Sequence, residues 1–425
     1  MTSLPIDESV SLACARARAT LPALAGKARA DKDDALRAIA RVLGEQRAQI
    51  LQANQADYEA ARVAGTPAAM LDRLRLTEAR MDAMAAAVGD VATQNDPVGQ
   101  VIESHVSPNG LSVSRVRVPL GLVAMIYEAR PNVTAEAAAL TLKAGDAIVL
   151  RGGSEALRSN IAIRAAIARA LGASGFPEEA VTLLTSTDRD GVRALVQTMT
   201  VDLAIPRGGE GLIRFVIEHA RVPVVQHFKG VCHLYVDAGA DLSMATELAV
   251  NGKLSRPGVC NALEALLVDR GDAPRLLPPI AQALLAGGCE LRGDEESRAV
   301  AASRGAVGIT AATDDDFGRE FLSEVMAVRI VDGLDGALAH IARYGSSHTE
   351  VICTRDAARG SRFQREVDAA CVMVNASSRF HDGGELGLGA ELGIATSRLH
   401  WRGPMGLEAL TTMKWLVAGD GQIRR

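Results

Sequence analysis

Leu122-Val-Ala-Met-Ile-Tyr127 is a short apolar run, followed by a helical pattern over Thr134–Leu142 and by a second apolar run at Ala147–Leu150. Strands that alternate with helices in this way are typical of the βαβ unit of a parallel sheet. The second run leads into Arg151-Gly-Gly153, a glycine turn of the kind that opens a helix. This stretch therefore predicts an α/β fold with a doubly wound sheet.

The same alternation of strands and helices continues after this stretch. A further helix is expected at Asn160–Ala170, and further strands are expected at Val181–Leu184, Leu203–Ile205 and Val222–Gln226. Parallel sheets of this type bind ligands beyond the carboxyl ends of their strands. The strand at Leu203–Ile205 runs into Pro206-Arg-Gly-Gly209, a second glycine turn before a helix.

A second α/β unit is expected to begin near His233–Val236. Its other strands are expected at Ala265–Val268, Val325–Val331, Val351–Cys353 and Cys371–Asn375. The chain then becomes glycine-rich from Gly383 to Gly393 and ends in an amphipathic stretch.

The first hundred residues read as successive helices. Asp31–Gln52 has a helical apolar period, and Thr77–Val91 repeats it with Thr77 as the N-cap. The pattern then changes, because Val101–Val106 and the alternating Gly110–Val118 flank a turn and predict a β-hairpin. An isolated hairpin is rarely stable, so this one is expected to lean on another part of the protein or on another subunit.

Composition excludes several classes of function. The chain has 425 residues, enough for two or three domains, and a formal net charge of −5, which does not suggest a nucleic-acid surface. Aromatic residues make up only 3%, so base-stacking surfaces are not expected either. Met1–Val10 does not resemble a signal peptide, and no apolar run is long enough to span a membrane. These features predict a cytoplasmic protein.

The six cysteines form no C-x-x-C pair, which argues against a zinc ribbon, and no metal site is expected. Cys260 differs from the others because it lies in Asn251-Gly-Lys-Leu-Ser-Arg-Pro-Gly-Val-Cys-Asn261, a polar stretch expected to be a loop. A loop thiol beside cations has a lowered pKa and reacts as a thiolate. Cys353 and Cys371 fall in strand patterns, Cys14 and Cys289 in surface-like contexts. A reactive role and a buried structural role both fit Cys260 on local context alone.

The two glycine turns are candidate phosphate sites. Glycines allow backbone amides to approach a phosphate, and the following helix N-terminus favours an anion. Neither turn is G-x-G-x-x-G, and a simple helix-entry turn is the alternative. An arginine beside a bound ribose would favour NADP over NAD. The candidate cofactor residues are Arg151, Gly152, Arg207, Gly208 and Gly209.

Longer motifs bring a family into view. The stretch from Val331 to Ile352, which contains Tyr344-Gly-Ser-Ser-His-Thr-Glu350, matches a long signature. Tyr127–Asn132, His227–His233, Arg256–Cys260 and Asn375–Gly384 add further matches. With these motifs the chain, over roughly residues 31–415, resembles the γ-glutamyl phosphate reductases (glutamate-5-semialdehyde dehydrogenases) of the aldehyde dehydrogenase superfamily.

This resemblance implies a fold of three parts. An NADP-binding domain is expected over residues 1–105 and 120–233, and a catalytic domain over 234–376. An oligomerisation arm is expected from 106–119 and 396–425, with 377–395 as a glycine-rich return segment. The arm implies a homo-oligomer, either a dimer or a tetramer.

The resemblance also implies roles for particular residues. Cys260 matches the family nucleophile, Glu320 the glutamate that holds the nicotinamide ribose, and Arg151 a lysine near the adenine ribose. His227 stands where hydrolytic relatives have the glutamate that activates water, which suits a reductase. The superfamily's oxyanion-hole asparagine matches Ala129, and Asn132 is the nearby substitute.

The implied reaction is NADPH-dependent reduction of L-glutamyl 5-phosphate through a Cys260 thioester, a step of proline biosynthesis. The residues expected to hold the substrate's anionic and amino-acid groups are Arg130, Lys253, Arg256, Asn375, Ser377, Ser378 and Arg379. A separate glutamate 5-kinase is implied as functional partner. The alternatives are a hydrolytic aldehyde dehydrogenase and a non-catalytic scaffold or NADP sensor.

Overall fold

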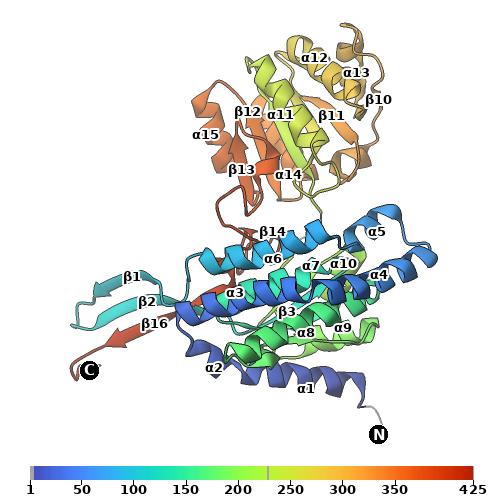
Figure 1. Ribbon diagram of the computed structural model, residues 1–425. Helices are drawn as coiled ribbons and strands as arrows, with labels where there is room; N and C mark the ends of the chain where they lie inside the picture. Colours follow the sequence, from blue (N-terminus) through green and yellow to red (C-terminus); the bar gives the residue numbers. More distant parts are fainter. Residues whose placement is uncertain (1–3, 227–228, 425) are drawn as a thin grey trace. The chain divides into compact units, whose positions relative to one another are not determined.

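The computed structural model describes residues 4–226 and 229–424 and divides the chain into two compact units (Figure 1). Unit 1 comprises residues 1–226, 387–393 and 405–425, and unit 2 comprises 227–386 and 394–404. The division after Gln226 falls a few residues before the expected boundary at 233. Residues 394–404, part of which was expected in the arm, belong to unit 2.

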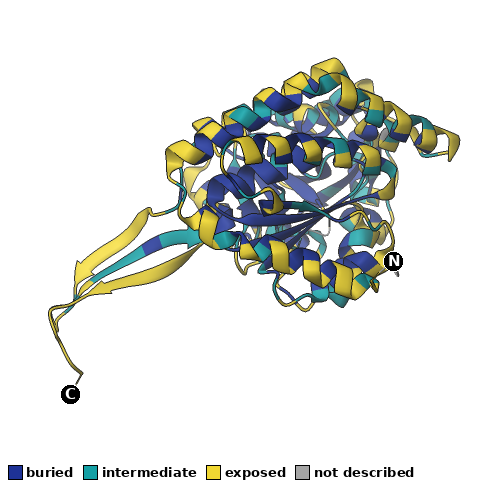
Figure 2. Ribbon diagram, turned by 60° about the horizontal axis from the view of Figure 1, so that its bottom comes forward, coloured by how far each residue is buried: buried dark blue, intermediate teal, exposed yellow. Residues whose placement is uncertain are grey.

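The core of unit 1 is a four-stranded parallel sheet with the order β5-β4-β3-β6. Its strands are β3 (Leu122–Tyr127), β4 (Ala147–Gly152), β5 (Val181–Leu183) and β6 (Leu203–Arg207). The helices that connect or follow them are α7 (Asn132–Ala144), α8 (Leu157–Ala173), α9 (Arg189–Gln197) and α10 (Glu210–His219). β3 and β4 are completely buried, as expected for strands covered on both faces, and Figure 2 shows this buried centre.

One expected strand of this sheet is wrong. Val222–Gln226 forms only a bridge between Val224 and Ala204. The Ala204 N–H donates to the Pro223 carbonyl, and the Val225 N–H donates back to Ala204. Pro223 has no N–H of its own, so the ladder does not extend.

The N-terminal helices form an outer layer of unit 1. They are α1 (Ile6–Ala19), α2 (Leu21–Ala25), α3 (Arg29–Glu45), α4 (Arg47–Val63), α5 (Ala68–Leu74) and α6 (Glu78–Thr93). The helix expected over Asp31–Gln52 is two helices that meet at Gln46. Thr77 caps α6, as predicted, because its hydroxyl accepts a hydrogen bond from the Arg80 N–H at 3.2 Å. α3 and α4 pack on α8, while α1 packs on α9.

The predicted hairpin is confirmed and has a third strand. β1 (Val101–Val106) pairs antiparallel with β2 (Ser112–Pro119), and β16 (Thr411–Ala418) pairs with the other edge of β2. The support that the hairpin needs therefore comes from the C-terminal stretch of the same chain. Figures 1 and 2 show these three strands extending from unit 1, with β1 and β16 mostly exposed and β2 half-buried between them.

Unit 2 contains a seven-stranded parallel sheet with the order β10-β9-β11-β8-β7-β12-β13. Its strands are β7 (Cys232–Val236), β8 (Leu263–Asp269), β9 (Glu290–Gly293), β10 (Thr310–Ala311), β11 (Val325–Val331), β12 (Thr349–Cys353) and β13 (Cys371–Val374). The helices are α11 (Leu242–Leu254), α12 (Ala273–Ala286), α13 (Glu295–Ala302), α14 (Gly333–Tyr344) and α15 (Ala357–Glu366). Two short strands, β14 (Ile394–Ala395) and β15 (Gly403–Pro404), pair with each other.

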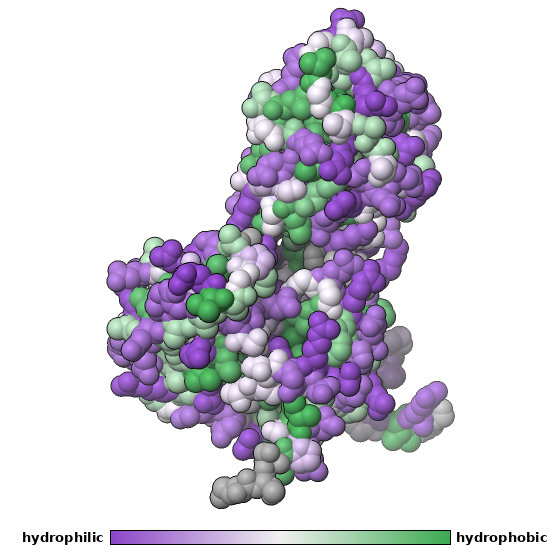
Figure 3. Space-filling view, turned by 90° about the vertical axis from the view of Figure 1, so that its right-hand side faces the viewer, coloured by the Kyte–Doolittle hydropathy of each residue, from purple (hydrophilic) through white to green (hydrophobic). Residues whose placement is uncertain are grey.

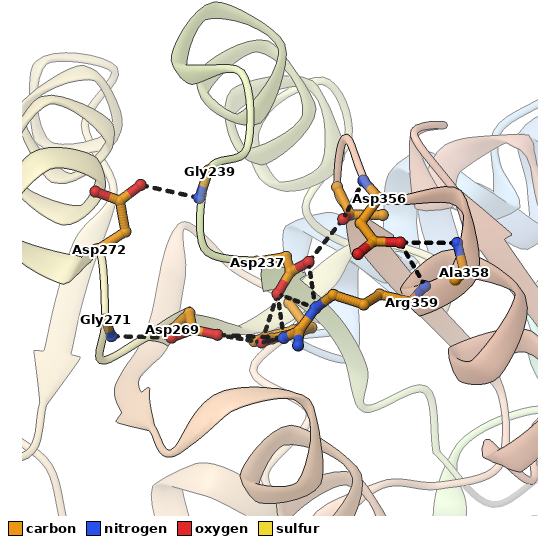
Figure 4. Close-up of polar contacts among 10 residues, drawn as sticks. Asp237, Gly239, Asp269, Gly271, Asp272, Asp356, Ala358 and Arg359 are labelled. Atoms are coloured by element: carbon orange, nitrogen blue, oxygen red, sulfur yellow. Dashed lines mark hydrogen bonds and ion pairs between the residues drawn. The ribbon is translucent and has the colours of Figure 1, made fainter.

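Arg359 forms a network of polar contacts at the carboxyl ends of the unit 2 strands (Figure 4). Arg359, in α15, donates to both carboxylate oxygens of Asp237, from Nε at 2.8 Å and from Nη2 at 2.5 Å. Tyr235 donates its hydroxyl to Asp269 at 2.7 Å, and Thr354 donates to Asp237 at 2.6 Å. Asp237 is completely buried, so its charge depends on these partners.

The outer surface is mainly polar. In the face drawn in Figure 3, hydrophilic residues predominate and hydrophobic residues form smaller groups between them. Within residues 4–226 and 229–424, no helix has both the length and the apolar character needed to cross a membrane.

Candidate active site

Cys260 lies at the amino end of β8, in the connection between α11 and this strand. The predicted loop is confirmed for residues 255–262, and the Cys260 side chain is partly exposed there. Asn251 and Lys253, which were expected in the same loop, instead form the last turn of α11. Cys260 therefore projects from a strand entrance, on the edge of the sheet opposite to the one where ligands of parallel sheets usually bind.

The other cysteines have buried or strand environments. Cys353 and Cys371 lie in strands, as predicted, whereas Cys14 and Cys289 are buried rather than surface-like. Burial raises the pKa of Cys14 and of Cys289 to about 11 and that of Cys353 to about 12. Cys232 is also buried, and burial raises its pKa well above the ordinary value. These environments suit inert thiols.

Gly230 packs directly on the backbone of Cys260. A Cβ atom at position 230 would lie 1.9 Å from the Cys260 carbonyl oxygen, so only glycine fits there. The Gly230 N–H donates to Glu320 Oε1 at 2.9 Å, and Lys229 Nζ donates to the Gly318 carbonyl at 2.6 Å. Glu320 is thereby linked to the Cys260 loop through Gly230.

Arg379 interacts electrostatically with both Arg256 and Cys260. The pKa of Arg379 is lowered by burial and by the like charge of Arg256, while Asp382 and Cys260 act in the opposite direction. Within the part of the chain that the structure describes, neither arginine forms an ion pair with a carboxylate. Two neighbouring guanidinium groups without such partners are suited to bind an anion.

Ser377 and Ser378 hold the return segment against the Cys260 loop. Ser378 donates its hydroxyl to the Asn261 carbonyl at 2.7 Å, and Ser377 donates to Asn251 Oδ1 at 2.6 Å. Asn261, next to Cys260, donates its amide to the His381 carbonyl at 3.0 Å. Both serines are buried, so their hydroxyls order the loop around Cys260.

Two residues that were expected to bind the substrate, Lys253 and Asn375, form hydrogen bonds with other parts of unit 2. Lys253 is completely buried, and its ammonium donates to Glu264 at 2.6 Å. Asn375 follows β13, where its side chain exchanges two hydrogen bonds of 2.9 Å with the backbone of Thr354. The structure therefore groups Cys260, Arg256, Arg379, Ser377 and Ser378, and it places Lys253 behind them and Asn375 at the other end of the sheet.

The candidate cofactor residues lie at the carboxyl ends of unit 1 strands, as expected for a doubly wound sheet. Arg151 and Gly152 end β4, and Arg207 ends β6, next to β3. Arg151 Nη2 donates to the carbonyls of Thr187 at 2.6 Å and Asp188 at 2.8 Å. Its Nε is buried without a hydrogen-bond partner among the described residues, and burial lowers its pKa.

A carboxylate occupies the entrance of α10. The N–H of Gly209, the N-cap, donates to Glu128 Oε2 at 2.9 Å. A Cβ atom at Gly208 would lie 2.4 Å from the same oxygen, so the glycine permits this approach. Arg207, before the turn, donates to the carbonyl of Leu392, which belongs to the 387–393 segment of unit 1. The turn after β6 thus accepts an anionic group on its backbone amide, which is the property expected of a phosphate site.

The segment after β3 carries the expected oxyanion-hole positions. Ala129 has a positive φ of 40° and donates its N–H to Glu155 at 2.5 Å. Asn132 begins α7 and donates its side-chain amide to Glu136 at 2.8 Å, and Arg130 lies between these two positions. A non-glycine residue at positive φ is uncommon, and such strain is concentrated at functional segments.

The signature histidines are buried in unit 2. His348 shares a contact of 2.6 Å with the Thr349 hydroxyl. His340 packs against aromatic rings, and burial lowers its pKa to about 2, which keeps it neutral. Across residues 4–226 and 229–424, no group of three or more His, Cys, Asp or Glu side chains is arranged to hold a metal ion. His227 lies outside the described residues.

Sequence reasoning missed several residues of these sites. Gly230 and Glu128 both stand inside motifs that carried the family resemblance, so their positions were visible although their contacts were not. Glu264 had no sequence signal, because its partner Lys253 is defined only by how α11 lies against β8.

The comparisons with known proteins agree with this geometry. Residues 6–293 match the model of the aldehyde dehydrogenase family. The chain is 57% identical to a γ-glutamyl phosphate reductase of Xanthomonas campestris, over 98% of this chain and 99% of that one. It is 56% identical to one of Sorangium cellulosum, over 100% of this chain and 99% of that one.

A crystal structure shows the same fold. The γ-glutamyl phosphate reductase of Thermotoga maritima superposes with a TM-score of 0.95 at 43% identity, covering 98% of this chain and 100% of that one. The chain therefore belongs to the aldehyde dehydrogenase family of oxidoreductases and, within it, to the γ-glutamyl phosphate reductases.

Proposed function

We propose that the protein reduces L-glutamyl 5-phosphate to L-glutamate 5-semialdehyde with NADPH and releases phosphate. The observation that carries this proposal is the group formed by Cys260, Arg256 and Arg379. It joins a partly exposed thiol with two guanidinium groups that lack an ion-pair partner among the described residues. Such a group suits a substrate in which an acyl carbon is bonded to a phosphate.

The first step is attack by the Cys260 thiolate on the acyl carbon. A carbon–sulfur bond forms, the bond between the acyl carbon and the phosphate oxygen breaks, and phosphate leaves with the electron pair. Arg256 and Arg379 would balance its charge as it departs. The backbone N–H of Cys260 would donate to the acyl oxygen, and Asn132 remains the candidate side-chain donor. The product of this step is a thioester on Cys260.

Reduction then releases the aldehyde. NADPH, when bound, supplies the hydride that the acyl carbon requires. Cys260 leaves as a thiolate and is ready for the next cycle. Ser377 and Ser378 keep the loop in place through their hydrogen bonds to Asn261 and Asn251. No carboxylate is needed to activate water, which agrees with histidine at position 227.

The unit 1 residues fit a nicotinamide dinucleotide phosphate. Gly208 and Gly209 form the turn before α10, and the Gly209 N–H would hold the pyrophosphate in place of the Glu128 carboxylate that it binds in this structure. Arg151, at the carboxyl end of β4, would stand near the ribose phosphate that distinguishes NADP from NAD. Glu320 would hold the nicotinamide ribose.

The biological setting is also part of the proposal. The reaction is a step of proline biosynthesis in the cytoplasm, and the enzyme is a homo-oligomer assembled through β1, β2 and β16. Acyl phosphates hydrolyse readily, so a glutamate 5-kinase must supply the substrate. We retain the domain roles given above, with unit 1 as the cofactor domain and unit 2 as the catalytic domain.

The reverse reaction tests the proposal with stable reagents. Glutamate 5-semialdehyde, phosphate and NADP are mixed with the protein, and NADPH absorbance is followed. We expect turnover that requires phosphate, because phosphate must displace Cys260 from the thioester. Turnover that ignores phosphate and yields glutamate would establish the hydrolytic alternative, and no turnover with any aldehyde would favour a non-catalytic role.

Arg379 gives a second prediction for the same assay. In Arg379→Gln, the KM for phosphate is expected to rise about 10- to 100-fold, because a charge-assisted hydrogen bond contributes about 1.5–3 kcal/mol. The KM for NADP should stay unchanged. Arg362→Gln is the control, since Arg362 is paired with Asp335 and Glu366 on the outside of α15. Equal phosphate KM values in the two variants would remove Arg379 from the phosphate site.

A further inference from the structure

We infer that Glu264, paired with Lys253, is a positioning residue that fixes the Cys260 loop and the Glu320 segment relative to each other. The inference rests on the proposed roles of Cys260 and Glu320. It goes beyond them because it assigns a task to two buried residues that touch neither the substrate nor the cofactor in the proposed scheme.

The ion pair closes the base of the nucleophile loop. Lys253 is in the last turn of α11, before the loop, and Glu264 is the second residue of β8, after it. Lys253 Nζ lies 2.6 Å from Glu264 Oε2, and the two side chains are 0% and 1% exposed. The two ends of the Cys260 loop are therefore clamped by one charge-assisted hydrogen bond.

The second oxygen of Glu264 holds a different segment. Glu264 Oε1 accepts the N–H of Leu322 at 3.3 Å, and the Phe321 N–H also lies within its hydrogen-bonding environment. Leu322 has a positive φ of 53°, which a leucine rarely adopts. A strained backbone of this kind persists only where surrounding contacts fix it, and Glu264 provides such contacts.

Glu320, two residues before Leu322, links this segment to Cys260 through Gly230. Its carboxylate accepts the Gly230 N–H at 2.9 Å, and Gly230 lies against the Cys260 backbone. The contacts thus form a closed path from Lys253 to Glu264, Leu322, Glu320, Gly230 and Cys260. If Glu264 is lost, both the loop and the Glu320 segment lose their common anchor.

The protonation of Glu264 gives this path a pH dependence. Burial raises the pKa of Glu264 to about 7, while Lys253 and the backbone N–H groups lower it. The other titratable groups facing it are the thiols of Cys232, from β7, and Cys289, before β9. As the pH falls through about 7, the carboxylate is neutralised and the clamp weakens, so kcat should decline on the acid side.

The test compares the reactivity of Cys260 with turnover in matched variants. Alkylation by iodoacetamide is followed by mass spectrometry of the peptide that contains Cys260, which requires neither substrate nor cofactor. In Glu264→Gln we expect the alkylation rate and kcat to fall at least about tenfold, since small misplacements of reacting groups have effects of up to about 100-fold. The KM for NADP should change less than kcat, and the acid limb near pH 7 should be absent.

A double variant separates positioning from stability. Lys253→Met combined with Glu264→Leu replaces the pair with apolar side chains, an exchange that often leaves folding intact. It also removes the acceptor for Leu322, so we expect a folded protein with the same loss of Cys260 reactivity. Asp237→Asn is the control, because Asp237 is an equally buried carboxylate at the opposite edge of the sheet.

Each outcome bears on the inference. Wild-type alkylation rates in the folded double variant would overturn it, as would equal losses of Cys260 reactivity in Asp237→Asn. Failure of the proposed function is distinguishable, because the wild-type protein would then show no phosphate-dependent turnover while the alkylation rates would still differ between variants.

Discussion

Replacing Cys260 with alanine is expected to abolish turnover and to leave the fold and cofactor binding intact. In the proposed scheme the Cys260 thiolate forms the covalent bond to the acyl carbon, whereas the neighbouring Cys232 thiol is buried and has a raised pKa. Loss of a nucleophile that acts together with its surroundings reduces kcat by about 10⁴-fold or more. The measurement is phosphate-dependent NADPH formation, with NADPH binding followed by its fluorescence.

Cys371→Ala is the matched control for this prediction. Cys371 is the other cysteine that is partly exposed, but it lies in β13, and burial raises its pKa. Its removal should leave turnover near the wild-type rate. Activity above a few per cent in Cys260→Ala, or a comparable loss in Cys371→Ala, would contradict the assignment of the nucleophile.

The buried strands could be predicted from the sequence because the strands of a parallel sheet are continuous apolar runs. Leu122–Tyr127 and Val325–Val331 have the bounds that their apolar runs predicted, since both faces of such strands are covered by helices. The break at Gln46 was not predicted, because the apolar period continues into α4 and the one local signal, Gly44 two residues before the break, lies inside the last turn of α3. Local patterns therefore define elements better than they define the joints between them.

The candidate site was predictable in part, and the limit has a physical cause. Cys260 stood out because glycine, proline and cations surround it in the sequence. Lys253, nearby in sequence, was assigned to the substrate, yet its ammonium is buried against Glu264. A cation beside a nucleophile can serve either the ligand or the scaffold, and only the packing of α11 on β8 decides between them.

The two sheets place their candidate sites at opposite edges. In unit 1 the glycine turns follow the carboxyl ends of β4 and β6, where doubly wound sheets usually bind ligands. In unit 2, Gly230, Cys260 and Glu320 all precede the amino ends of their strands. The carboxyl ends of the unit 2 strands are instead occupied by the Arg359 network of Figure 4. There Arg359 forms ion pairs with Asp237 and Asp269.

This network leads to the largest expected effect on stability. Asp237→Ala removes the acceptor of Arg359 and Thr354 together. Asp237 is completely buried, whereas Arg359 is 36% exposed and keeps Asp269 at 3.5 Å, so we expect a cost at or below the about 3–5 kcal/mol of a fully buried pair. We expect the urea midpoint of unit 2 to fall by about 1–2 M.

Tryptophan fluorescence can report unit 2 alone. The chain has two tryptophans, of which Trp401 lies in unit 2 and Trp415 in β16 of unit 1. In a Trp415→Phe background, the signal therefore follows unit 2 through Trp401. Asp335→Ala, which removes an exposed partner of Arg362, should leave the midpoint unchanged. Similar midpoints for Asp237→Ala and Asp335→Ala would mean that the carboxyl edge of the sheet is held by its apolar core, and that the Arg359 network contributes little.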